Sequence, residues 1–184
     1  ELLPALLRAL GIDPARERMA LLGHSDGGSI ALLHAAMFPG QLRACIVLAP
    51  HILVEEISVQ SIAKTRDAYL HTDLRQKLAR YHQDPDSAFW GWNDIWLHPD
   101  FRSWRITQEL PSITCPVLAI QGLDDEYGTL EQVRGIARIV PQCQVVALPD
   151  CGHSAHKDQP AEVTRLIRDF LASCPSRETD ALRR

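Results

Sequence analysis

Short apolar runs that end in turn residues recur along the chain, and each has the length of a buried β-strand. They cover residues 19–22, 44–49, 117–121 and 144–148. Strands that are buried on both faces of a parallel sheet form continuous apolar runs, without the alternation of a half-exposed strand. The pattern therefore predicts four strands of one parallel sheet.

Segments with apolar residues at helical spacing lie between and around these runs. The leucines of residues 1–10 repeat at this spacing, and two further segments, 29–38 and 130–140, each end at a proline. A last amphipathic helix is expected to begin near Pro160, because proline suits the first helical turn. The alternation of strands and helices predicts an α/β fold.

Residues 55–110 interrupt this alternation. They show no strand pattern, and they contain all four tryptophans within DSAFWGWNDIWLHPDFRSW. We interpret them as a helical cap that covers one edge of the sheet and divides the α/β core into residues 1–54 and 111–174. The polar residues 175–184 predict a frayed tail.

The composition of the 184 residues is that of a globular protein, with 46% hydrophobic and 23% charged residues, which argues against disorder. The formal net charge is −4 and the 19 basic residues are scattered, so neither nucleic acid nor an anionic membrane surface is expected as a partner. No apolar run approaches the roughly 18 residues that a membrane span requires. The oligomeric state cannot be inferred from these features.

The five cysteines are odd in number and show no C-x-x-C spacing, which predicts neither a disulfide framework nor a zinc site. Cys45 and Cys115 lie beside apolar runs, and we interpret them as buried thiols. A reducing cytoplasm is the simplest compartment for such a chain. The histidines show no H-E-x-x-H or comparable spacing, so no metal and no cofactor is expected.

Ser25 is the first candidate for chemistry. It lies in the G-x-S-x-G of residues 23–27, between a predicted strand and a predicted helix, as a nucleophile elbow requires. In such a tight turn we expect glycine to be needed on both sides, at Gly23 and Gly27, with Gly28 adding clearance. The alternative is a glycine-rich turn that holds a phosphate, but neither G-x-x-x-x-G-K-[ST] nor G-x-G-x-x-G occurs here.

A serine needs a base to take its proton and a carboxylate to orient that base. The third predicted strand runs into Asp124 and Asp125, and the fourth is followed by His153. Because the carboxyl ends of parallel strands meet at one edge of the sheet, we expect these groups to converge on Ser25.

Three segments, GHSDGG, PVLAIQGLDDEYG and LPDCGHSAHKDQP, resemble the nucleophile, acid and histidine motifs of the α/β-hydrolase superfamily. The resemblance covers residues 19–172 and implies a catalytic triad of Ser25, Asp125 and His153, with Asp125 rather than Asp124 as the acid. It also implies that the backbone N–H of Asp26 is one oxyanion donor. The four strands then correspond to the fifth to eighth of the family.

The first four strands of that family have no counterpart in this sequence, nor does the loop that supplies a second oxyanion donor. The strand before Ser25 would then lack one neighbour. We therefore expect the chain to be part of a protein of roughly 270 to 300 residues, which still fits one domain.

Four further residues are candidates for substrate binding: His24 and His51 near the strand ends, and Trp90 and Trp92 in the cap. His51 follows a strand end, where it either faces the pocket or lies in solvent. Together with Trp96, the two tryptophans form either the core of the cap or an aromatic wall for an apolar acyl group.

The resemblance implies a cofactor-independent serine hydrolase that acts through an acyl-enzyme on a small acyl substrate. The bond cleaved would be a carboxylic ester or a related acyl or C–C bond. The alternatives are a haloperoxidase-like or acyltransferase activity, which the same triad supports, or a binding protein that keeps the scaffold without catalysis.

Overall fold

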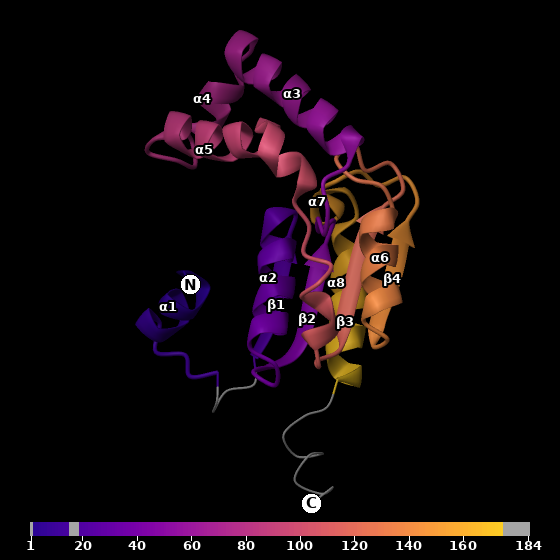
Figure 1. Ribbon diagram of the computed structural model, residues 1–184. Coiled ribbons are helices and arrows are strands. Elements are labelled where there is room, and N and C mark those ends of the chain that lie inside the picture. Colours follow the sequence, from indigo (N-terminus) through magenta and orange to yellow (C-terminus); the bar gives the residue numbers. More distant parts are fainter. Residues whose placement is uncertain (1, 15–18, 175–184) are drawn as a thin grey trace, which may run out of the picture.

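The structure, a computed structural model, describes residues 2–14 and 19–174 (Figure 1). At its centre lies a four-stranded parallel sheet in the order β1-β2-β3-β4. The predicted strands are confirmed, with ends that shift by one or two residues. Their bounds are β1 Met19–His24, β2 Leu42–Leu48, β3 Val117–Gly122 and β4 Cys143–Leu148.

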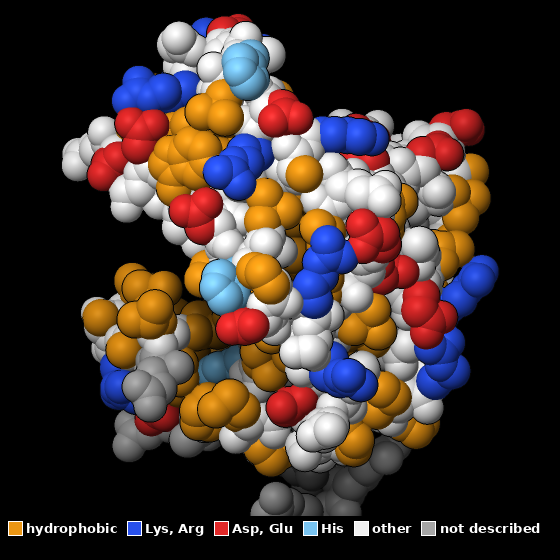
Figure 2. Space-filling view, turned by 45° about the horizontal axis from the view of Figure 1, so that its top comes forward, with side chains coloured by type: hydrophobic (Ala, Val, Ile, Leu, Met, Phe, Trp, Pro, Cys, Tyr) orange, Lys and Arg blue, Asp and Glu red, His pale blue; other side chains and the backbone are white. Residues whose placement is uncertain are grey.

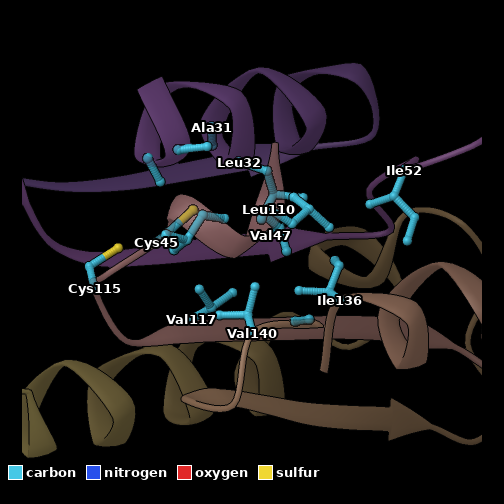
Figure 3. Close-up of a cluster of buried hydrophobic side chains, with 14 of the residues drawn as sticks. Ala31, Leu32, Cys45, Val47, Ile52, Leu110, Cys115, Val117, Ile136 and Val140 are labelled. Carbon is cyan, nitrogen blue, oxygen red and sulfur yellow. The ribbon is translucent and has the colours of Figure 1, made fainter. Parts of the chain in front are cut away.

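Helices cover both faces of the sheet (Figure 1). On one face lie α2 (Asp26–Met37) and α6 (Glu131–Ile139), and on the other lies α8 (Pro160–Ser173), which begins at the predicted proline. Between α2, α6 and the sheet, a cluster of buried residues includes Leu32, Val47 and Ile136 (Figure 3). Together these layers confirm the predicted α/β class of fold and its parallel sheet.

The register of the sheet aligns the carboxyl ends of the strands. His24 pairs with Leu48, and Gly122 pairs with Leu148. Each strand therefore ends at the same edge, and the loop that follows it begins there. This edge carries the candidate site.

The first helix, α1 (Leu2–Ala9), lies beside α2 across a groove lined by apolar residues of both helices. Within the described residues, β1 pairs only with β2, and the side chain of Leu22 on β1 is 54% exposed. The strand that precedes Ser25 thus has one bonded neighbour in the described part of the chain, as the sequence predicts.

Between β2 and β3 the chain is helical (Figure 1). It forms α3 (Glu56–His71), α4 (Leu74–Leu78) and α5 (Pro85–Leu97), which we call the cap helices, and the short 3-10 helices η1 (Pro99–Ser103) and η2 (Leu110–Ser112). The cap helices have a core of their own, in which the rings of Tyr69 and Phe89 stack at 3.7 Å.

The end of this segment packs against the sheet. Ile106 and Leu110 are buried in the cluster between the sheet and α2, together with Ile113. The division of the chain into core and cap stays a prediction, and the predicted tail, 175–184, lies outside the described residues.

Both cysteines that the sequence places in the core are buried, with Cys45 0% and Cys115 6% exposed. Burial raises the pKa of the Cys45 thiol, so the thiol remains protonated. Among the described helices, none is long and apolar enough to span a lipid bilayer.

Candidate active site

Ser25 occupies a sharp turn between β1 and α2. Its backbone has φ 55° and ψ −124°, in a region that costs a non-glycine residue energy unless the surroundings hold it there. The surroundings are β2 and α2: the N–H of Ser25 donates to Leu48 O at 2.9 Å, and the N–H of Gly28 donates to Ser25 O at 2.8 Å. The turn therefore holds the hydroxyl at the edge of the sheet.

The glycines of this turn have different roles. A Cβ on Gly23 would lie 2.1 Å from the carbonyl oxygen of Gly27, so only glycine fits at position 23. A Cβ on Gly28 would lie 3.0 Å from the Cβ of Pro50, which is a tight contact. A Cβ on Gly27 would meet nothing within 4 Å. The expectation that both glycines flanking the turn are needed is therefore wrong for Gly27, because a side chain at position 27 would not meet any neighbouring atom.

The three residues of the predicted triad are hydrogen-bonded in a chain. His153 Nε2 lies 2.9 Å from Ser25 Oγ, and His153 Nδ1 lies 2.9 Å from Asp125 Oδ1. The side chain of His153 is 12% exposed and that of Asp125 is 1% exposed. Nδ1 faces the carboxylate, which can only accept a hydrogen bond, and Nε2 faces the serine hydroxyl, which is the arrangement a general base requires.

Asp125 accepts two further hydrogen bonds. The Tyr127 N–H donates to Oδ1 at 2.8 Å, and the Gln121 amide donates to Oδ2 at 3.1 Å. Burial alone would raise the pKa of Asp125, but the hydrogen bond and charge of His153, together with the Tyr127 N–H, hold it below its usual 3.8. Asp125 is therefore a carboxylate at neutral pH.

Sequence reasoning missed Gln121. Its amide also donates to Gly128 O at 2.8 Å, and its side chain is 1% exposed. The signal was a single polar residue at the end of an otherwise apolar strand, 117–121. A buried amide there needs a partner, and the carboxylate of Asp125 supplies it.

The loop after β3 is in close contact with the loop after β4. A Cβ on Gly122 would lie 2.0 Å from Cys151 O, and the N–H of Asp124 donates to the same oxygen at 2.9 Å. Further along, the N–H of His153 donates to Glu126 Oε2 at 3.2 Å. The absence of a side chain at position 122 lets the loop after β3 and the loop after β4 meet.

His24 lines the cavity above Ser25, but its hydrogen bond goes to the protein. Its Nε2 lies 2.9 Å from the carbonyl oxygen of His153, so this nitrogen must donate. Its ring lies 4.9 Å from that of His153 and 4.7 Å from that of His156. Burial, and then the neighbouring histidines, lower the pKa of His24 below 6.5, which favours a neutral ring. The contact supports the backbone of His153, and the role of His24 in substrate binding stays a prediction.

His51 faces the cavity rather than solvent. Its side chain is 3% exposed, lies edge-on to Trp96 at 4.9 Å and is 6.0 Å from the ring of His153. Burial, followed by the nearby His153, lowers the pKa of His51. Of the two alternatives for this residue, the structure therefore supports the one in the pocket.

The cavity above Ser25 has a volume of about 400 Å³. A second, more apolar cavity of about 400 Å³ adjoins it, and the two share Asp26, Trp92 and Trp96. In Figure 2, hydrophobic side chains border the hollow beside the cap helices. The indole N–H of Trp96 donates to Asp26 Oδ2 at 3.3 Å and so joins the cap to the start of α2.

The tryptophans differ in position. Trp92 lines both cavities and remains a candidate for substrate contact. Trp90 lines neither. It packs against Phe89 at 5.0 Å and lies under the guanidinium of Arg66 at 5.6 Å. The structure thus places Trp90 among residues of the cap helices and outside both cavities, and its role in substrate binding stays a prediction.

Asp26 is the first residue of α2, directly after Ser25. The N–H groups of a first helical turn and the positive end of the helix dipole favour a developing negative charge. The position of Asp26 agrees with the expected role of its backbone N–H as an oxyanion donor, and this role stays a prediction. In residues 2–14 and 19–174, no cluster of three or more histidine, cysteine or carboxylate side chains could hold a metal ion.

The sequence profile of the alpha/beta hydrolase family matches residues 1–166. The chain belongs to the α/β-hydrolase family. Among solved structures, the meta-cleavage product hydrolase from Pseudomonas fluorescens has a TM-score of 0.71, with 16% sequence identity, 92% of this chain covered and 69% of that chain. At this identity the likeness shows the fold.

The curated relatives of this α/β hydrolase are hydrolases of several kinds. Human monoacylglycerol lipase ABHD6 is 22% identical in an alignment that covers 83% of this chain and 54% of the lipase. The 2-hydroxy-6-oxo-6-phenylhexa-2,4-dienoate hydrolase of Burkholderia cepacia is 26% identical in an alignment that covers 91% of this chain and 66% of that enzyme. The chain thus spans between about half and two thirds of their length.

The elbow gives a first prediction. Gly23→Ala is expected to lower the free energy of unfolding by about 2 kcal/mol or more, since its methyl group meets the backbone of Gly27. Gly27→Ala is the matched control and is expected to leave stability unchanged or slightly raised, because the site is open and helical. Urea unfolding measures both, and equal losses in the two variants would contradict this account of the turn.

The lowered pKa of Asp125 gives a second prediction. A carboxyl whose pKa is lower in the folded than in the unfolded chain adds stability above its unfolded value, and this stability is lost as the pH falls through its folded value. The difference in unfolding free energy between the wild type and Asp125→Asn should therefore be constant above about pH 5 and shrink below it. Urea unfolding across this range is the measurement, and a difference that does not change with pH would refute it.

Proposed function

We propose that this chain carries the catalytic centre of a serine hydrolase that cleaves a carboxylic ester or a related acyl or C–C bond through an acyl-enzyme. The observation that carries the proposal is the chain of hydrogen bonds from Ser25 through His153 to Asp125. A buried carboxylate, an oriented imidazole and a serine held on a strained turn are the parts that such chemistry requires.

In the proposed reaction, His153 Nε2 takes the proton of Ser25 as Oγ attacks the substrate carbonyl carbon. The carbonyl oxygen becomes an oxyanion beside the N–H of Asp26, and Asp125 stabilises the imidazolium. His153 then gives its proton to the leaving group, which departs as an alcohol or, after C–C cleavage, as a protonated carbon fragment. A water molecule activated by the same histidine releases the acid and restores Ser25.

The cavities support a small substrate with a polar and an apolar part. The cavity at Ser25 carries the polar groups of His24, His51 and Tyr127, whereas the adjoining one is lined mainly by aromatic and aliphatic side chains. The relatives whose names specify a monoacylglycerol or a dienoate agree with an acyl substrate of this kind. The proposed reaction needs no cofactor, and the cytoplasmic location stays a prediction.

Labelling of Ser25 tests the proposal. A fluorophosphonate should form a covalent adduct at Ser25 in the full-length protein, and Ser25→Ala should abolish it. Ester turnover should fall in Ser25→Ala by a factor on the order of 10⁴ or more. A folded protein that forms no adduct and turns over no ester would refute the proposal and favour a binding protein on the same scaffold.

The two tryptophans give a matched test of the substrate cavity. Trp92→Ala should lower kcat/KM for long-chain or aromatic p-nitrophenyl esters relative to the acetate by about tenfold or more, because a wall of both cavities is lost. Trp90→Ala is the control and should leave this ratio unchanged, since Trp90 lines neither cavity. Equal changes in the two variants would show that the ratio reports on the cap as a whole.

A further inference from the structure

The loop that carries Asp125 is attached to a cap helix as well as to the sheet. We call residues 123–128 the acid loop. Three hydroxyl side chains of α3 (Ser58, Ser61 and Thr65) have the spacing of one helix face. Each of them has a hydrogen bond to the acid loop or to a side chain of it.

Two of the contacts go to backbone carbonyls of the acid loop, and the third goes to the side chain of Tyr127. Ser58 Oγ donates to Tyr127 O at 2.6 Å, and Ser61 Oγ donates to Glu126 O. Thr65 Oγ1 donates to Ser61 O at 2.9 Å, so its 2.8 Å contact with Tyr127 must use the tyrosine hydroxyl as the donor.

Where the acid loop ends, the residue before α3 adds two more bonds. Glu55 accepts from the N–H of Thr129 at 2.9 Å and from its hydroxyl at 2.6 Å. Hydrogen bonds therefore connect residues 126, 127 and 129 to the first three turns of α3 and to the residue that precedes this helix.

The same two residues of the loop, Glu126 and Tyr127, are hydrogen-bonded to Asp125 and His153. The N–H of Tyr127 donates to Asp125 Oδ1, and the carboxylate of Glu126 accepts from the N–H of His153. A shift of residues 126–127 away from α3 would thus move one donor away from Asp125 and one acceptor away from His153. The helix and the Asp125–His153 pair are linked through the N–H of Tyr127 and the side chain of Glu126.

The three hydroxyls lie outside the cavity in which a substrate would bind. None of the three lines the cavity at Ser25, and Ser58 is 0% exposed. A buried hydroxyl that donates to a loop carbonyl fixes the position of that loop, and its removal leaves the carbonyl without its partner.

On the basis of the proposed function, we propose that Ser58, Ser61 and Thr65 are positioning residues for the Asp125–His153 pair. They set the acid loop against α3, so that the placement of the cap determines how well the acid holds the imidazole. The cap then has a second role besides shaping the cavity: the triad has its full geometry only when α3 is docked.

The test uses Ser58→Ala and Thr65→Val in the full-length protein, with two measurements. The first is the downfield proton resonance of the His153 Nδ1–H in an NMR spectrum, which reports on the bond to Asp125 whether or not the protein turns over substrate. The second is the separation of kcat and KM on a p-nitrophenyl ester. We expect the resonance to shift upfield and broaden, and kcat to fall about fivefold in each variant, with KM nearly constant.

Thr72→Val is the matched control. Thr72 caps the other end of α3, and its hydroxyl donates to Ala68 O at 2.6 Å without reaching the acid loop. The same threonine-to-valine exchange there should leave both measurements unchanged. Thr65→Ser, which keeps the hydroxyl, should restore the wild-type resonance and kcat.

The outcomes separate the two proposals. An unchanged resonance and kcat in Ser58→Ala and Thr65→Val would overturn the positioning role while Ser25 still forms its fluorophosphonate adduct. A rise in KM alone, or the same effect in Thr72→Val, would also overturn it. If Ser58→Ala fails to fold, Ser61→Ala gives the same test, since Ser61 is more accessible to solvent than Ser58. Failure of the hydrolase proposal would instead appear as a wild type without an adduct.

Discussion

The in-register parallel pairing of the four strands is the constraint on which the site depends. Because β1 to β4 end at one edge of the sheet, a turn or loop of a few residues after each strand delivers its side chain to the same place. Ser25 follows β1, His51 follows β2, Asp125 follows β3 and His153 follows β4. A parallel sheet also needs long crossovers between its strands, and the crossover between β2 and β3 includes the cap helices.

Buried polar groups then fix the loops that the sheet brings together. The carboxylate of Asp125 is removed from solvent, so its cost of burial must be offset by the donors His153, Tyr127 and Gln121. A second buried amide, Gln132, is 0% exposed and accepts from the N–H of Ile52 at 2.7 Å. The bonds of Asp125 connect the loop after β3 to the loop after β4, and the bond of Gln132 connects the loop after β2 to α6.

Several features of the site were predictable from neighbours along the chain. A serine between glycines after an apolar run indicates an elbow, and Asp125 and His153 each follow an apolar run. The expectation for Gly27 was wrong, because its surroundings are open, and Trp90 lines neither cavity although Trp92, two residues further along the chain, lines both. Both observations have one cause: the identity of a residue does not determine its surroundings, and the packing of distant segments does.

The sequence by itself determined the order of strands and helices, the elbow and the residue types of the proposed triad, because each depends on local spacing. Only the tertiary structure decided that His51 is buried in the pocket, that Gln121 holds Asp125 and that the hydroxyls of α3 reach the acid loop. The hydroxyls of Ser58 and Ser61 lie more than 60 residues from the carbonyls they contact. Contacts of that separation exist only after the sheet and the cap have packed, so no pattern within a short stretch of sequence records them.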